Sequence, residues 1–201
     1  MTARKAIYCS GSIAKGASDK GRQCWTDAER AKVSYGAAPE EIVFLNPDDP
    51  ITDASNTLGQ FGRDMFQVMT ATAVIVDARE RRGIGIGVEM AAAATFGTPV
   101  IVVAPRNTLY RQDALEYRGN TVVNYVHPHV ASLATKVVDD FEAAGRAVAS
   151  LPIRGAASPS GSPDWLMLAV EEYTKNVLPG DAPMLNALHA LDHSDSATSS
   201  S

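Results

Sequence analysis

The chain has 201 residues, of which 45% are hydrophobic and 20% are charged, and its formal net charge is −5. This composition is typical of a globular protein with a sizeable core. The negative balance argues against a nucleic acid polymer as a partner, and no apolar run has the length of a membrane helix. Cys9 and Cys24 are too few for a disulfide scaffold and lack a metal-ligand spacing. No signal-peptide pattern opens the chain, so we expect a cytoplasmic protein that binds no membrane.

Short apolar runs alternate with helical patterns along the first 150 residues. The runs that predict strands are Ala6–Cys9, Glu41–Leu45, Ala73–Asp77, Pro99–Ala104 and Thr121–Val126. The segments that predict helices are Trp25–Tyr35, Ser55–Met69, Val88–Phe96 and Ala131–Ala149. Such alternation is typical of βαβ units. We therefore predict an α/β fold, with a doubly wound, mostly parallel five-stranded sheet flanked by helices, of the flavodoxin or Rossmann-like kind.

The amino-acid composition changes after Ser150. Residues 1–150 are expected to form the α/β domain, and the segment 151–162 is a linker rich in Pro, Gly and Ser. A helical extension is predicted over 163–192, with helices at Asp164–Leu178 and Met184–Leu191, before a disordered tail over 193–201. We expect the extension to pack on the core or on a second subunit.

The segment from Ala73 to Val103 carries most of the functional information. Its first strand ends at Asp77, a loop with Gly83, Gly85 and Gly87 follows, and Glu89 opens the next helix. In an open parallel sheet, ligands lie where the strands end, and glycines let backbone amides approach them. Glu89 has no lysine partner in its own turn and is a candidate reactive carboxylate. The alternative is an acid that only stabilises the helix dipole.

The end of the first strand supplies a second group of candidates. Tyr8 is either a core tyrosine or a side chain whose hydroxyl reaches the ligand crevice. It is followed by small groups suited to holding a sugar or a phosphate, namely Ser10, Gly11, Ser12 and Ile13.

Asp64, in the segment GRDMF, lies on the predicted helix before the third strand. It is either a solvated surface acid paired with Arg63 or a carboxylate turned toward the sheet edge beside Phe61 and Val68. In the second arrangement, loss of water around the carboxylate would suit it for proton transfer.

Several other motifs are excluded. The glycines follow the third strand rather than the first, and their spacing does not match a dinucleotide fingerprint. The sequence has no Walker lysine motif and no G-x-S-x-G elbow. His127 and His129, in the segment VHPH, lack the acidic or cysteine partners of a zinc site, which favours a polar turn.

Together, three segments resemble the nucleoside 2-deoxyribosyltransferase superfamily, which includes the 2′-deoxynucleoside 5′-phosphate N-hydrolases. These segments are IYCSGSIAKG (Ile7–Gly16), GRDMF (Gly62–Phe66) and GIGIGVEMAAA (Gly83–Ala93) followed by TPVIVVAP, and the resemblance spans roughly Ile7 to Val126. It implies cleavage or transfer of the N-glycosidic bond of a small nucleoside or nucleotide. It also implies a homodimer or a higher homo-oligomer, with loops of a second subunit completing the site.

The resemblance implies a role for each candidate side chain. Glu89 would attack the anomeric carbon and form a covalent glycosyl intermediate, Asp64 would transfer protons, and Tyr8 would orient Glu89. No metal or organic cofactor is implied, because the glutamate and the leaving base supply the chemistry. The groups expected to bind the substrate are Ser10, Gly11, Ser12, Ile13, Asp77, Arg82, Gly83, Gly85 and Gly87.

One position departs from the family pattern. Six residues before the glutamate, the transferases carry an aspartate for the free sugar hydroxyl and the hydrolases a serine for phosphate, whereas this chain has Gly83. Arg81 and Arg82 either receive a phosphate there or belong to a solvated loop. Two alternative functions stay open: a non-catalytic nucleotide sensor, and a phosphoribohydrolase of the cytokinin-activating type, whose P-G-G-x-G-T-x-x-E loop is missing from the sequence.

Overall fold

The computed structural model describes residues 4–11, 25–47, 55, 57–80, 83–152, 175 and 179. The chain divides into two compact units, Met1–Gly161 and Ser162–Ser201, and the helices and strands below belong to the first. The two C-terminal helices predicted from the sequence lie outside the described residues. Within the described ranges, no helix combines the length and apolarity needed to cross a membrane.

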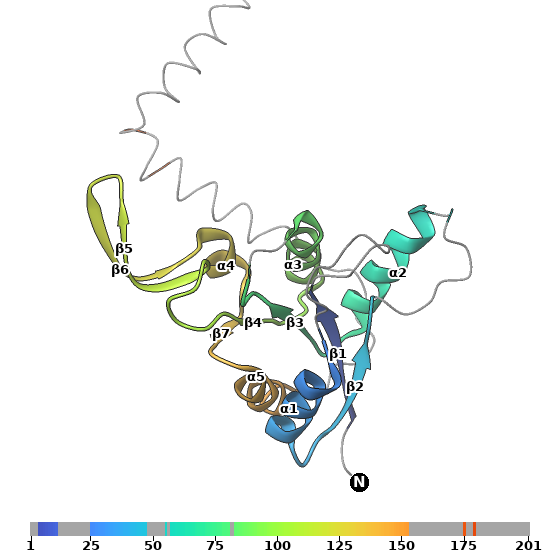
Figure 1. The fold of residues 1–201 in the computed structure, drawn as a ribbon. Helices are drawn as coiled ribbons and strands as arrows, with labels where there is room; N and C mark the ends of the chain where they lie inside the picture. Colours follow the sequence, from blue (N-terminus) through green and yellow to red (C-terminus); the bar gives the residue numbers. More distant parts are fainter. Residues whose placement is uncertain are drawn as a thin grey trace, which may run out of the picture. The chain divides into compact units, whose positions relative to one another are not determined.

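Five parallel strands form the central sheet (Figure 1). They are β1 (Arg4–Ser10), β2 (Glu41–Leu45), β3 (Ala73–Asp77), β4 (Val100–Val103) and β7 (Lys136–Val138), in the order β2-β1-β3-β4-β7. Every residue of β3 and β4 is buried, as expected for central strands with helices on both faces. The predicted doubly wound α/β sheet is thereby confirmed.

Helices cover both faces of this sheet. On one face lie α1 (Asp27–Ala37) and α5 (Phe141–Ala149), and on the other lie α2 (Thr57–Thr70), α3 (Ile84–Phe96) and α4 (Pro128–Leu133). Each face has its own apolar cluster, because successive side chains of a strand point to opposite sides. Tyr8, Val74 and Val76 belong to the α2/α3 face, whereas Ile7, Cys9 and Ile75 belong to the α1/α5 face.

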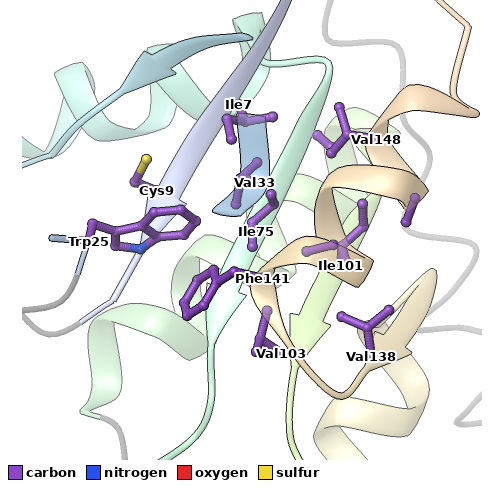
Figure 2. Packing of buried hydrophobic residues seen from close by; sticks show 13 residues of the cluster. Ile7, Cys9, Trp25, Val33, Ile75, Ile101, Val103, Val138, Phe141 and Val148 are labelled. Atoms are coloured by element: carbon purple, nitrogen blue, oxygen red, sulfur yellow. The ribbon is translucent and has the colours of Figure 1, made fainter. Parts of the chain in front are cut away.

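The α1/α5 face is closely packed. Figure 2 shows Trp25 and Phe141 beside the strand residues, and their ring centroids lie 5.1 Å apart in an edge-to-face arrangement. Gly36 of α1 and Gly145 of α5 lie where the two helices touch, and a Cβ at either position would collide with the backbone of the opposite helix. The two glycines therefore set how closely these helices approach.

The predicted strand Thr121–Val126 does not belong to the central sheet. It is part of β6 (Asn120–Val126), which pairs antiparallel with β5 (Arg111–Tyr117) in a separate two-stranded sheet. The turn between them has positive φ at both Arg118 (49°) and Gly119 (79°), which suits a tight hairpin. The expectation of a fifth parallel strand at this point was wrong.

The predicted helix Ala131–Ala149 is also wrong, because this range holds the end of α4, the strand β7 and the helix α5. Thr135 interrupts it by exchanging two hydrogen bonds with Val100, donating its own N–H to the Val100 carbonyl (2.7 Å) and accepting the Val100 N–H at its hydroxyl (3.0 Å). Asp140 then starts α5 by accepting the N–H of Ala143 at 2.7 Å. The β-branched pair in Lys136–Val138 completes the sheet.

Helix α3 begins at Ile84 rather than at the predicted Val88. Gly83 is its N-cap, and Gly85 and Gly87 lie inside its first turns instead of forming a loop. The predicted bounds of β2 and β3 agree with the structure, and β1 and α2 differ from prediction by one or two residues at each end.

The strand order fixes where a ligand crevice forms. The chain passes from β1 outward to β2 and then returns across β1 to β3, so the direction of winding reverses between β1 and β3. In open α/β sheets the crevice lies at the carboxyl ends of the strands at this reversal. Here those ends are Ser10 and Asp77.

Candidate active site

Strand β1 brings two hydroxyl groups to the crevice. Tyr8 and Ser10 are alternate residues, so both side chains lie on the α2/α3 face, and both residues are fully buried. They pair with Val74 and Val76 of β3, respectively, which places them against the most buried strand of the sheet. The two hydroxyls are therefore held on a rigid support.

Both hydroxyls donate to one carboxylate, that of Glu89 in α3. The Tyr8 hydroxyl lies 3.0 Å from Oε1, and the Ser10 hydroxyl lies 2.5 Å from Oε2. With one donor on each oxygen, the plane of the carboxylate is fixed and each oxygen keeps a lone pair. The structure thus brings Tyr8, Ser10 and Glu89 together, and Ser10 contacts the glutamate directly.

The surroundings of Glu89 raise its pKa from 4.5 to about 7. Burial is the main cause, and the negative charge of Asp64 adds to it, whereas the hydrogen bonds from Ser10 and Tyr8 act in the opposite direction. Burial also raises the pKa of Tyr8, helped by the charges of Glu89 and Asp64. Tyr8 therefore stays protonated and serves as a donor.

Asp64 belongs to α2 and acts on this group through its charge. It is partly buried, and its charge raises the pKa of both Tyr8 and Glu89, so it lies within electrostatic range of both. A second carboxylate close to the first makes full ionisation of the pair costly. The hypothesis that Asp64 faces the sheet edge, rather than a solvated surface beside Arg63, stays a prediction.

Trp25, which sequence reasoning had not linked to the site, holds the end of β1. Its indole N–H donates to the Ser10 carbonyl at 3.1 Å, while its ring packs on Phe141 in the core. Nothing in the spacing of the sequence connects residue 25 with residue 10. Only the tertiary packing of the segment before α1 shows this contact.

The Asp77 side chain lies on the opposite face of the sheet from Tyr8 and Ser10. It shares the α1/α5 face with Ile75, and its two oxygens each accept a hydrogen bond of 2.8 Å from Arg79. Arg79 also pairs with Glu29 of α1 and lies over the Phe141 ring, 4.7 Å from its centroid. The structure therefore places Asp77 in a network that ties β3 to α1 and α5, on the opposite face from Glu89.

The remaining predicted residues fall into two groups. Gly11 directly follows β1 and is partly buried, whereas Ser12, Ile13 and Arg82 lie outside the described residues. Gly83, Gly85 and Gly87 are exposed, and a Cβ at any of them would meet no described atom within 4 Å. Packing within the described part of the chain therefore does not require glycine at these positions.

The described residues contain no group of three or more His, Cys, Asp or Glu side chains that could hold a metal ion. His127 and His129 lie side by side, with ring centroids 5.2 Å apart. The groups that the structure places at Glu89 are a carboxylate with a pKa of about 7, two hydroxyl donors and a second carboxylate that acts on it through its charge.

The fold and this site define a doubly wound α/β protein with a partly buried carboxylate at the reversal point of its sheet. Neither a protein-family model nor a curated protein sequence matches the chain. Among solved structures, one described as a 2-desoxiribosyltransferase from Leishmania mexicana is similar to this chain, with 22% identity and a TM-score of 0.44. The match covers 70% of this chain and 93% of that chain.

Proposed function

We propose that the protein cleaves or transfers the N-glycosidic bond of a small nucleoside, 2′-deoxynucleoside or nucleoside 5′-monophosphate, with Glu89 as the nucleophile. The observation that carries this proposal is the Glu89 carboxylate, partly buried near the end of β1 with the Tyr8 and Ser10 hydroxyls on its two oxygens. Acids with a structural role in a protein interior are commonly paired with a cation, as Asp77 is with Arg79. The described donors to Glu89 are instead neutral hydroxyls, which orient the carboxylate and leave its charge available.

In the first chemical step, a Glu89 oxygen forms a bond to the anomeric carbon while the bond from that carbon to the base nitrogen breaks. The bonding electron pair leaves with the base, and the base takes up a proton, which Asp64 supplies when it is protonated. The transition state carries positive charge on the sugar ring, and the adjacent carboxylate stabilises that charge. The product is a glycosyl ester of Glu89.

The second step releases the sugar. Water or an incoming base attacks the anomeric carbon, the ester bond to Glu89 breaks, and Asp64 takes the proton that the nucleophile loses. Attack by water makes the protein a hydrolase, and attack by a base makes it a transferase. The Tyr8 and Ser10 hydroxyls support both steps, because they hold the leaving carboxylate in place.

The experiment that tests this function is a substrate panel. The full chain is incubated with deoxynucleosides, ribonucleosides and their 5′-monophosphates, with and without a free acceptor base, and products are separated by chromatography. Release of free base supports hydrolysis, and exchange of bases supports transfer. Binding of these compounds without turnover would reject the catalytic proposal in favour of a sensor.

A trapping experiment tests the nucleophile separately. A 2′-fluoro-arabinosyl nucleoside slows hydrolysis of the glycosyl ester, so intact-mass spectrometry should detect one sugar adduct per chain, and peptide mapping should locate it on Glu89. Glu89→Gln should form no adduct, while Glu80→Gln serves as a control acid on the same β3–α3 connection. An adduct on another residue would remove Glu89 from the role.

A further inference from the structure

Five side chains form a cluster on the α1/α5 face of the sheet, at the ends of β1 and β3. They are Trp25, Glu29, Asp77, Arg79 and Phe141, and we call this set the rear cluster. All of its members except Arg79 are buried, and Figure 2 shows Trp25 and Phe141 beside the core residues of the sheet. The Tyr8 and Ser10 hydroxyls point to the α2/α3 face, so the rear cluster lies on the other side of the sheet from the Glu89 group.

Arg79 holds the charged members of the rear cluster together. Its guanidinium donates to both oxygens of Asp77, at 2.8 Å each, and also pairs with Glu29. The same guanidinium lies over the Phe141 ring, 4.7 Å from its centroid. Glu29 in turn accepts the backbone N–H of Thr26, the N-cap of α1, at 2.8 Å. These charge-assisted contacts fix the end of β3 and the start of α1 relative to each other.

Trp25 is the member of the cluster that reaches the candidate site. Its indole N–H donates to the Ser10 carbonyl at 3.1 Å, while its ring meets Phe141 edge to face, with centroids 5.1 Å apart. Ser10 is the last residue of β1, and its hydroxyl donates to Glu89 on the opposite face of the sheet at 2.5 Å. Ser10 therefore joins a main-chain contact with the rear cluster to a side-chain contact with the carboxylate.

The backbone of Trp25 is strained. Its φ of 63° lies in the left-handed region, which bulky residues rarely occupy. Such conformations persist where the surroundings impose them, and they gather at functional sites. Here the indole is held by the Ser10 carbonyl and by the Phe141 ring, and Glu29 fixes the peptide that follows. The rear cluster thus holds Trp25 in a conformation that brings its N–H to the end of β1.

From these contacts we propose that Trp25 is a positioning residue for Glu89: it holds the Ser10 main chain so that the Ser10 hydroxyl stays on the carboxylate. The rear cluster is the frame that holds Trp25 in place. Trp25 acts through Ser10 and not on the substrate. Its effect on turnover rests on the proposed function of Glu89, whereas its effect on the Glu89 carboxylate itself does not.

Loss of the indole N–H has a defined consequence for Glu89. Without that donor the Ser10 peptide group is less firmly held, so the hydrogen bond from the Ser10 hydroxyl to the carboxylate weakens. Because this bond lowers the pKa of Glu89 in the wild type, the pKa should rise, by less than in Ser10→Ala. Loss of one neutral hydrogen bond predicts a fall in kcat of roughly 2- to 10-fold. KM should stay near its wild-type value, because no group that touches the substrate has changed.

The test replaces Trp25 in the full chain with 3-benzothienylalanine, which keeps the bicyclic ring and has sulfur in place of the N–H. Packing on Phe141 is thereby retained. Carbon NMR titration of labelled glutamate then gives the pKa of Glu89 without any substrate, and Glu89→Gln identifies its signal. Val33→Ala is the control for lost packing, because Val33 is buried in the apolar cluster that contains Trp25. It should lower stability and leave the pKa of Glu89 unchanged.

A double-mutant cycle tests whether Trp25 acts through the Ser10 hydroxyl. In the Ser10→Ala chain that hydroxyl is absent, so the same replacement of Trp25 should cause no further change in the pKa of Glu89. A residue that only stabilises the core would lower stability in both chains without this dependence on Ser10.

Two results would overturn the proposal. One is a pKa of Glu89 that the replacement of Trp25 leaves unchanged, and the other is an equal change in the wild-type and Ser10→Ala chains. A raised pKa in a protein that turns over no compound of the substrate panel would support the positioning role and reject only the proposed reaction. If the benzothienyl chain does not fold by circular dichroism, Trp25→Phe, which also lacks the N–H, takes its place in the same titration.

Discussion

The Ser10 hydroxyl lies 2.5 Å from Oε2 of Glu89 and joins the carboxyl end of β1 to α3. The two residues are 79 positions apart in the chain, yet this bond and its Tyr8 counterpart define the orientation of the carboxylate. Trp25 holds the Ser10 carbonyl, so the position of the glutamate depends on the core as well as on the crevice. Substitutions at Ser10 should therefore change the pKa of Glu89 while leaving the chain folded.

Ser10→Ala should raise the pKa of Glu89, because the Ser10 hydrogen bond lowers it in the wild type. A hydrogen bond to a charged group is worth about 1.5–3 kcal/mol, so we expect kcat/KM at neutral pH to fall by roughly 10- to 100-fold. The acidic limb of the pH profile should move to higher pH. Carbon NMR titration of labelled glutamate measures the pKa without substrate, and Tyr8→Phe should shift it in the same direction. A fall in the pKa would show that the hydroxyls do not stabilise the ionised form.

Asp64→Asn should have the opposite effect on acidity. The Asp64 charge raises the pKa of Glu89, so its removal should lower that pKa and move the acidic limb of the profile to lower pH. If Asp64 also carries the proton, kcat should fall by roughly 10²- to 10⁴-fold at every pH. A shifted profile with an unchanged kcat would restrict Asp64 to an electrostatic role. Asp139→Asn, an exposed acid on the connection between β7 and α5, is the control.

Much of the fold was predictable because local patterns and tertiary packing agree there. The strand Ala73–Asp77 is a continuous apolar run ending in an acid, and burial on both faces leaves no other solution for it. The region after β4 could not be predicted in the same way. Its hairpin depends on the positive φ of Arg118 and Gly119, and β7 depends on hydrogen bonds between Thr135 and the distant Val100.

The candidate site was likewise predictable only in part. Spacing along the sequence pointed to Tyr8 and Glu89, which the structure brings into contact. The sequence analysis did not consider on which face of the sheet the Asp77 side chain lies. Alternation along β3 places Asp77 on the side of Ile75 and away from Val76. Asp77 was assigned to ligand binding because all side chains at the end of the strand were expected to face the crevice, whereas successive side chains face opposite sides of the sheet.

Glu89→Gln should stabilise the protein at alkaline pH. The folded chain binds the Glu89 proton more tightly than the unfolded chain does, because the pKa is about 7 rather than 4.5. Stability of the wild type is therefore lost as pH rises from about 4.5 to 7, by at most about 3 kcal/mol. Gln carries no charge, so its Tm should exceed that of the wild type at pH 8, with a smaller difference at pH 5. Equal Tm differences at pH 5 and pH 8 would contradict a Glu89 carboxylate whose ionisation destabilises the folded protein.

The contact between α1 and α5 offers the clearest stability test. Gly145→Ala places a methyl group against the Val33 carbonyl and the Ala37 nitrogen, and these backbone atoms have no rotamer by which to move aside. We expect the free energy of unfolding to fall by about 1–3 kcal/mol or more, as for other overpacked cores. Gly85→Ala is the matched control, since its methyl group would meet no described atom and alanine favours a helix by about 0.5–1 kcal/mol.

Urea denaturation of Gly145→Ala and Gly85→Ala measures the change in the free energy of unfolding directly. The midpoint should fall for Gly145→Ala and stay level or rise for Gly85→Ala. Gly36→Ala, on the opposite helix, should fall in the same way, because its methyl group would meet the Glu142 carbonyl. The double variant Gly36→Ala/Gly145→Ala should lose less than the sum of the single losses, because one separation of the helices relieves both clashes. Full additivity would mean that the two glycines act at independent contacts.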